Sequence, residues 1–259
     1  MIEEPYRWVE AIANRREYID TELAGGSPII GISFAEGILL LTFSRDRRKI
    51  FEVYDRIALG GIGHPGDIER LRMLAIELAS TEGFTRSAAD VSVRRMASYS
   101  FSPALKEAFE QVYGAPYLVR LLFAEVGDAP AEDILLRIDY DGATHANAKA
   151  GGGVRENFGA IAGTRRGLEE IEKYLRQTPA SNRRRAVDAA IRAWGIGLYF
   201  ADEDHSELPD DAALKEFIKS HLEEYTLEAA LLVRAVRPPR VAFTDLAAAD
   251  VEAALSGFR

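Results

Sequence analysis

The stretch RKIFEVYDRIALGGIGHPGDIERLR, residues 48–72, predicts two strands followed directly by a helix. Residues 49–55 are rich in β-branched and aromatic residues and residues 56–63 contain two isoleucines, so both suit strands. Residues 65–67, Pro-Gly-Asp, then open a helix that we expect to run to about Ser80, because proline is favoured in a first helical turn. Its apolar residues recur at helical spacing and form one face: Ile68, Leu71, Leu74, Ala75 and Leu78.

The same strand and helix signals extend in both directions from this stretch. Upstream, we expect an exposed helix over residues 6–24, ended by Gly25-Gly26, and a hairpin of strands over 28–34 and 37–43. Downstream, a helical region over 88–112 is interrupted at Pro103, with Ser102 as the cap of a restart. The remaining expected elements are a strand at 117–126, a hairpin about Asp141-Gly142, helices at 154–176, 181–200 and 212–223, strands within 226–236 and 240–246, and a helix at 245–256.

The order of these elements predicts an α+β fold. Several strands are apolar on both faces, which implies sheets that are covered on both sides. Two strand-rich blocks, each followed by helices, indicate two packed sheets between two helical layers. We find no repeat or linker, so residues 1–259 are expected to form a single domain.

Composition excludes several classes of function. The chain has 259 residues, a formal net charge of −9 and no cysteine, which rules out disulfides and thiolate chemistry. An acidic protein is a poor partner for nucleic acid. The four histidines are far apart, so we expect neither a metal site nor a cofactor. No apolar run approaches the ~18 residues of a membrane span, and we expect a cytoplasmic protein.

Ser27, directly after Gly25-Gly26, raises the question of a masked nucleophile. A catalytic amino-terminal hydroxyl needs a free amine, a nearby cation and an acid that holds that cation. The chain begins 26 residues before Ser27, and Pro28 stiffens the bond region that processing would have to cut. A structural serine at the start of a strand is therefore favoured. Lys49, alone before a strand, is uninformative.

Five segments in one order carry a resemblance to a known family. They are the helix before residues 27–43 together with that hairpin, residues 48–72, APYLVRLLFAEVG (115–127), RIDYDGA (137–143) and TLEAALLVRAVRPPR (226–240). Over about residues 6–245 the chain resembles the α-type subunits of the proteasome core particle, in particular the actinobacterial form. The resemblance implies the four-layer αββα sandwich of the N-terminal-nucleophile hydrolases.

The resemblance also implies that this chain is not itself a peptidase. In the family, β subunits carry an N-terminal threonine nucleophile and α subunits carry no active site. Ser27 falls at the position of that threonine and Lys49 at that of the catalytic lysine. Phe43 replaces the acid on the second strand, and the later serine falls in the glycine run at Gly152. Glu228 lies near a further family acid but has no serine neighbour.

The functions implied for an α subunit are ring formation, gating and docking. Family α subunits form homo-heptameric outer rings on rings of β subunits, control substrate entry and contribute to ubiquitin-independent protein degradation. Lys49 is expected in a pocket between neighbouring α subunits that binds the C-terminal carboxylate of a ring-shaped AAA+ ATPase or another activator, with Gly63 giving that tail room. The helix over residues 6–24 is expected beside the pore, with the gate before it: Met1, Ile2, Glu3, Glu4 and Pro5.

Two alternatives stay open at this point. One is a self-processing hydrolase that uses Ser27, and the other is a ring without β subunits that acts as a scaffold or holdase.

Overall fold

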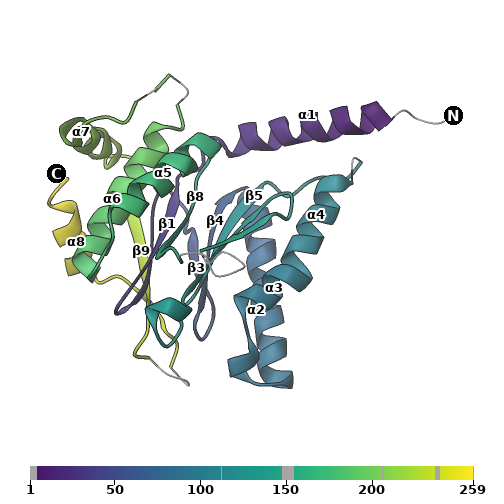
Figure 1. Cartoon of the computed structure of the whole chain (residues 1–259), viewed down its shortest axis with the longest axis horizontal. Coiled ribbons are helices and arrows are strands. Elements are labelled where there is room, and N and C mark those ends of the chain that lie inside the picture. Colours follow the sequence, from purple (N-terminus) through teal and green to yellow (C-terminus); the bar gives the residue numbers. More distant parts are fainter. Residues whose placement is uncertain are drawn as a thin grey trace.

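Two antiparallel sheets lie face to face between layers of helices (Figure 1). The computed structural model describes residues 5–111, 113–147, 155–202, 204–205, 207–236 and 240–258. Within these ranges the first sheet has the order β10-β9-β2-β1-β8 and the second has the order β3-β4-β5-β6-β7. The first consists of β1 (Ile29–Phe34), β2 (Gly37–Ser44), β8 (Phe158–Ile161), β9 (Thr226–Val233) and β10 (Phe243–Asp245). The second consists of β3 (Ile50–Tyr54), β4 (Ile57–Gly63), β5 (Val119–Glu125), β6 (Ile134–Asp139) and β7 (Thr144–Ala146).

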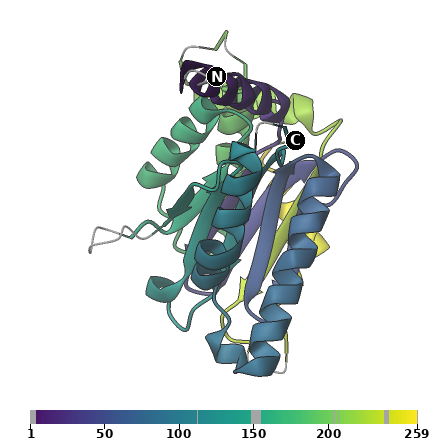
Figure 2. The same cartoon turned by 90° about the vertical axis from the view of Figure 1, so that its right-hand side faces the viewer.

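Helices cover the outer face of each sheet and leave three apolar layers inside. The helices are α1 (Pro5–Leu23), α2 (Pro65–Thr85), α3 (Val93–Met96), α4 (Ser102–Glu110), α5 (Arg165–Gln177), α6 (Arg183–Tyr199), α7 (Asp211–His221) and α8 (Ala248–Leu255). α5 and α6 pack on the first sheet around the buried Trp194. α2 to α4 pack on the second sheet, and Figure 2 shows α2 lying along its face. Ile29, Leu40 and Leu122 belong to the layer between the sheets. The predicted αββα sandwich is confirmed.

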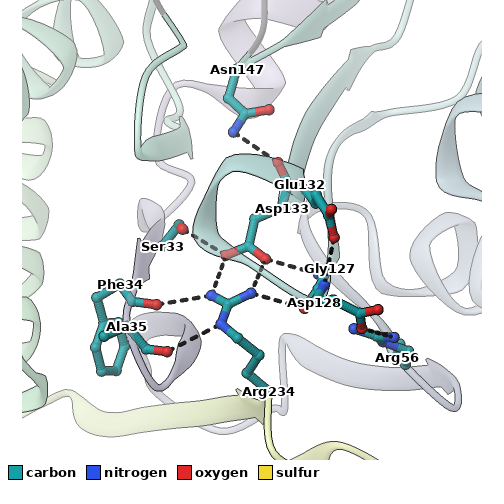
Figure 3. A network of polar contacts seen from close by, with 10 residues as sticks. All are labelled: Ser33, Phe34, Ala35, Arg56, Gly127, Asp128, Glu132, Asp133, Asn147 and Arg234. Carbon is teal, nitrogen blue, oxygen red and sulfur yellow. Dashed lines mark hydrogen bonds and ion pairs between the residues drawn. The ribbon is translucent and has the colours of Figure 1, made fainter.

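A buried ion pair joins the two sheets at one end (Figure 3). Arg234, directly after β9, donates to both carboxylate oxygens of Asp133, at 2.7 and 2.8 Å. Its remaining N–H groups donate to backbone carbonyls that include those of Phe34 and Gly127. Ser33 Oγ and the Gly127 amide donate to the same carboxylate. Because Asp133 precedes β6 and Ser33 lies on β1, this network ties one sheet to the other.

The helix α1 is buried at its base and projects from the body at its start (Figure 1). Ile19 and Leu23 are buried, whereas Trp8 is 52% exposed. Arg120 on β5 donates to Asp20 at 2.6 Å and to the backbone carbonyls of residues 162 and 163. Tyr140 donates to the same Asp20 oxygen at 3.0 Å. The last turns of α1 are therefore clamped to the second sheet.

The predicted helix over residues 154–176 is wrong in its first part. Residues 158–161 form β8, which pairs antiparallel with β1, and α5 begins at Arg165 after the capping residue Thr164. Phe158, Ala160 and Ile161 are buried in that strand. Pairing with a strand far away in the sequence, rather than local spacing, decides the structure here.

The interruption and restart predicted at Pro103 are confirmed. Pro103 lies in the first turn of α4, where a missing N–H costs nothing, and a π-turn over residues 97–101 connects α3 to α4. Ser102 does not cap the helix as predicted, because it is itself the first residue of α4 and Phe101 occupies the capping position. The Ser102 hydroxyl instead donates to the Gly142 carbonyl at 2.6 Å. The helix α2 continues to Thr85, beyond the expected end at Ser80.

In the part of the chain that the structure describes, no helix combines the length and apolarity that a bilayer crossing requires.

Candidate functional site

A cleft of about 730 Å³ opens between the end of α1, the loop from β2 to β3 and the start of α2. Its lining includes Ser27, Lys49 and Gly63, three residues that the sequence analysis singled out separately. Leu23 and Ile68 add apolar surface. These three residues each lie at the end of a strand. Ser27 precedes β1, Lys49 precedes β3 and Gly63 ends β4.

Ser27 has a structural task in this cleft. Its side chain is buried, and its hydroxyl donates to the Phe43 carbonyl at 2.6 Å. The indole Nε1–H of Trp194 donates to the same hydroxyl at 2.8 Å. The Phe43 ring, at the position where a catalytic acid would stand, packs on Trp194 with 4.2 Å between ring centroids. The Ser27 hydroxyl therefore links the start of β1 to β2 and α6. An engaged hydroxyl of this kind does not favour the self-processing hydrolase.

Lys49 is a partly buried cation with one hydrogen bond to the backbone. Its Nζ donates to the Ser27 carbonyl at 3.2 Å, not to the Ser27 hydroxyl. Burial lowers the pKa of Lys49 from its ordinary value of 10.5 to about 8, against the opposing effect of the nearby Glu228 carboxylate. The ammonium is therefore short of compensating charge, and an anion that enters the cleft would supply it.

Glu228 is the residue whose place in the site the sequence analysis did not foresee. Its carboxylate accepts hydrogen bonds from the backbone amide of Lys49 at 2.9 and 3.1 Å and from that of Ile50 at 2.8 Å. The resemblance indicated only that it lies near a family acid. The available signal was a lone charged residue within the otherwise apolar run of β9.

The backbone conformation at position 63 requires a glycine. Its φ is +120°, a conformation that side chains rarely adopt, and a Cβ there would collide with the Leu118 carbonyl. Glycine at this position thus has a packing reason that is independent of any bound tail.

The loop that closes the cleft is basic in an otherwise acidic protein. Arg45, Arg47 and Arg48 stand directly before Lys49 and line the same cleft. Arg45 pairs with Glu224 at 2.9 Å, and Arg48 pairs with Asp245 at 2.6 Å. A cleft with a partly buried ammonium, apolar walls and a basic rim suits the end of a polypeptide chain that carries a carboxylate.

The other predicted site residues lie partly outside the described residues. Met1 to Glu4 and Gly152 are among them, so the structure neither supports nor opposes their expected roles. Pro5 begins α1 at the end that projects from the body.

Comparisons with known proteins agree on one family. A family model described as "Proteasome subunit" matches residues 23–170. A protein named "Proteasome subunit alpha" from Acidothermus cellulolyticus is 30% identical over 190 residues, which cover 71% of this chain and 77% of that protein. A protein of the same name from Streptomyces coelicolor is 32% identical over 157 residues, 59% of this chain and 61% of its own length. Another from a Nocardioides species is 27% identical over 207 residues, 78% of this chain and 74% of its own length.

Proposed function

Because this chain belongs to the proteasome subunit family and is of its α type, we propose that it forms the outer heptameric ring of a core particle and docks an activator there. In this proposal the ring controls the entry of substrates to β subunits that degrade them. The activator is a ring-shaped ATPase or another protein whose C-terminal tails enter the clefts. The observation that carries the proposal is the partly buried ammonium of Lys49 in a cleft that also holds Gly63.

An α-type subunit is the non-catalytic kind, and the contacts of Ser27 are consistent with that. Its hydroxyl is engaged with Phe43 and Trp194, and its carbonyl accepts from Lys49. The peptidase of the complex is therefore expected on a separate β chain that carries an N-terminal threonine. Purification of the α chain together with such a partner would separate this proposal from the scaffold or holdase alternative.

Docking at Lys49 is favoured because a carboxylate that enters the cleft needs a cation beside it. A tail carboxylate that enters the cleft loses water, and this loss must be offset by a cation or by amide donors. Lys49 offers a charge and up to three donors. A hydrogen bond to a charged group contributes roughly 1.5–3 kcal/mol, so its loss should weaken tail binding about ten- to a hundredfold.

The experiment compares assembled α–β particles that carry wild-type α chains, Lys49→Met, Lys49→Arg or the control Lys173→Met. Lys173 is an exposed lysine on α5, 63% accessible and paired with Glu170, so its loss changes the net charge equally but leaves the cleft intact. A labelled peptide with the tail sequence of the activator is titrated onto each particle. We expect Lys49→Met to lose most of the affinity and Lys49→Arg to keep part of it. Equal affinities for wild type and Lys49→Met would refute docking at this site.

The gate is proposed before α1. Seven copies of Glu3 and Glu4 would crowd acidic charge at one opening of the ring. Deletion of residues 2–5 should therefore speed peptide hydrolysis by the particle. An unchanged rate in an intact particle would place the gate elsewhere.

A further inference from the structure

The backbone that presents Lys49 is held by a carboxylate from the other sheet. We propose that Glu228 is the positioning residue of the Lys49 cleft, which fixes the backbone of residues 49 and 50 and supplies the counter-charge that keeps the ammonium ready for an incoming anion. The tail as that anion rests on the proposed docking function, whereas the link between Glu228 and Lys49 stands on the structure alone.

The geometry places Glu228 between two elements that do not otherwise pair. Glu228 lies on β9 of the first sheet, opposite Thr42 of β2, and its side chain is 17% exposed. Ile50 begins β3 at the edge of the second sheet, and Lys49 directly precedes it. The three N–H···O contacts at 2.8 to 3.1 Å therefore hold the start of β3 against the first sheet. A shift of this start would move the Lys49 side chain within the cleft.

The contacts of Glu228 favour its ionised form. All three hydrogen bonds come from backbone N–H donors, and Arg48 Nε lies 3.7 Å from Oε1. Burial raises the pKa of Glu228, while these donors and the cations of Arg48 and Lys49 oppose the rise. The carboxylate is thus both an anchor for the backbone and a negative charge next to Lys49.

Glu228 lies behind Lys49 and not in the lining of the cleft, and its charge opposes the effect of burial on the pKa of Lys49. The lining from α1 contributes Glu22, and that from α2 contributes Glu69, which is engaged with Arg72 at 2.7 Å. The loop before Lys49 contributes Asp46 together with Arg45, Arg47 and Arg48. Tyr225 is the remaining titratable residue of the lining.

A change of Glu228→Gln keeps the shape and one carbonyl acceptor but removes the charge. If Glu228 acts as a counter-charge, the midpoint of Lys49 titration should fall below the wild-type value of about 8. We expect a shift of roughly one pH unit, the low end of what a neighbouring opposite charge produces. A purely structural role would leave the midpoint where it is.

The test measures Lys49 directly in the full chain. Samples at pH 6 to 11 receive a brief pulse of acetic anhydride, which reacts with the neutral amine, and the acetylated Lys49 peptide is quantified by mass spectrometry. The matched control is Glu224→Gln, since Glu224 is 65% exposed and pairs with Arg45 at the rim of the cleft. A midpoint that falls in Glu228→Gln and stays in Glu224→Gln supports the proposal. An unmoved midpoint in Glu228→Gln, equal shifts in both variants, or a wild-type midpoint near 10.5 overturns it.

A second measurement separates this proposal from tail docking. The probe is a fluorescent peptide, Gly-Ser-Gly-Ala-Leu-Leu with a free carboxyl terminus, chosen for the apolar walls of the cleft, and its amide serves as the control. With a midpoint one unit lower, Glu228→Gln has roughly eightfold less protonated Lys49 at pH 8.5 and nearly the same amount at pH 6. The ratio of its probe affinities at pH 6 and pH 8.5 should exceed the wild-type ratio by about that factor, a comparison that cancels the pH-independent effect of removing the Glu228 charge. If Lys49→Met binds the probe as tightly as the wild type does, docking at Lys49 is refuted. The acetylation result on Glu228 is not affected by that outcome.

Discussion

Replacement of Lys49 by methionine should make the protein more stable while it removes the docking cation. Burial lowers the pKa of Lys49 from 10.5 to about 8, a difference that corresponds to about 3 kcal/mol. Below pH 8 the folded chain keeps the ammonium charged at this cost. Lys49→Met removes the cost but leaves Glu228 with less positive charge nearby, so we expect a gain of about 1–3 kcal/mol in the free energy of unfolding at pH 7.

The pH dependence of that gain has a definite sign. Between about pH 8 and 10.5 the unfolded chain still binds the Lys49 proton while the folded chain has released it. The unfolded state therefore binds more protons, and the stability of the wild type rises with pH across this window relative to Lys49→Met. The advantage of the methionine variant should shrink from pH 7 to pH 10.

Guanidinium unfolding of the isolated α chain at pH 7 and pH 10 measures both effects. Lys173→Met, a change at an exposed lysine, should stay within about 0.5 kcal/mol of the wild type at either pH. A Lys49→Met chain that is less stable than the wild type at pH 7 would refute the reasoning. So would a gain of the same size at both pH values, because it would arise from packing and not from charge.

Two further predictions concern buried polar contacts. Arg234→Met leaves the fully buried Asp133 without its cation and should lower the free energy of unfolding by about 3–5 kcal/mol in the same denaturation assay. The addition of Asp133→Leu should restore part of this loss. A loss below about 1 kcal/mol in Arg234→Met would contradict the role of this pair. Ser27→Ala leaves the Trp194 indole N–H without its partner and removes the shorter of the two side-chain hydrogen bonds to the Phe43 carbonyl, which keeps the one from Thr42 Oγ1 at 3.4 Å. It should therefore lower that free energy by about 1–3 kcal/mol without changing the peptidase rate of assembled particles. A particle that assembles normally but loses activity would show that Ser27 takes part in catalysis.

Much of the fold was predictable because its signals are local. Residues 48–72 form β3, β4 and the start of α2 nearly as predicted, and Pro65 lies in the first turn of that helix. By contrast, β8 is a strand because it pairs with β1, more than a hundred positions earlier, and its residues 158–161 carry little signal of their own. Ser102 was expected to cap a helix, but the chain is already helical at Phe101, and its hydroxyl donates to the carbonyl of Gly142, 40 positions away.

The candidate site was predictable in its members but not in its contacts. The family resemblance singled out Ser27, Lys49 and Gly63, and the structure places them in the lining of one cleft. Trp194 contacts Ser27 and Glu228 contacts Lys49, although these partners are 167 and 179 residues apart in the sequence. Spacing along the chain carries no information about contacts of this kind, because they depend on how the two sheets pack.

The clamp at the base of α1 gives that helix the proportions of a lever. Asp20, held by Arg120, serves as the fulcrum, and Leu23 on the short arm lines the Lys49 cleft. At 1.5 Å per residue, the long arm from Asp20 to Pro5 measures about 22 Å and the short arm to Leu23 about 4.5 Å. A rigid rotation about Asp20 would therefore multiply a displacement of Leu23 roughly fivefold at the start of the helix, so that a movement of 1 Å beside the cleft becomes a movement of about 5 Å where residues 1–4 are attached.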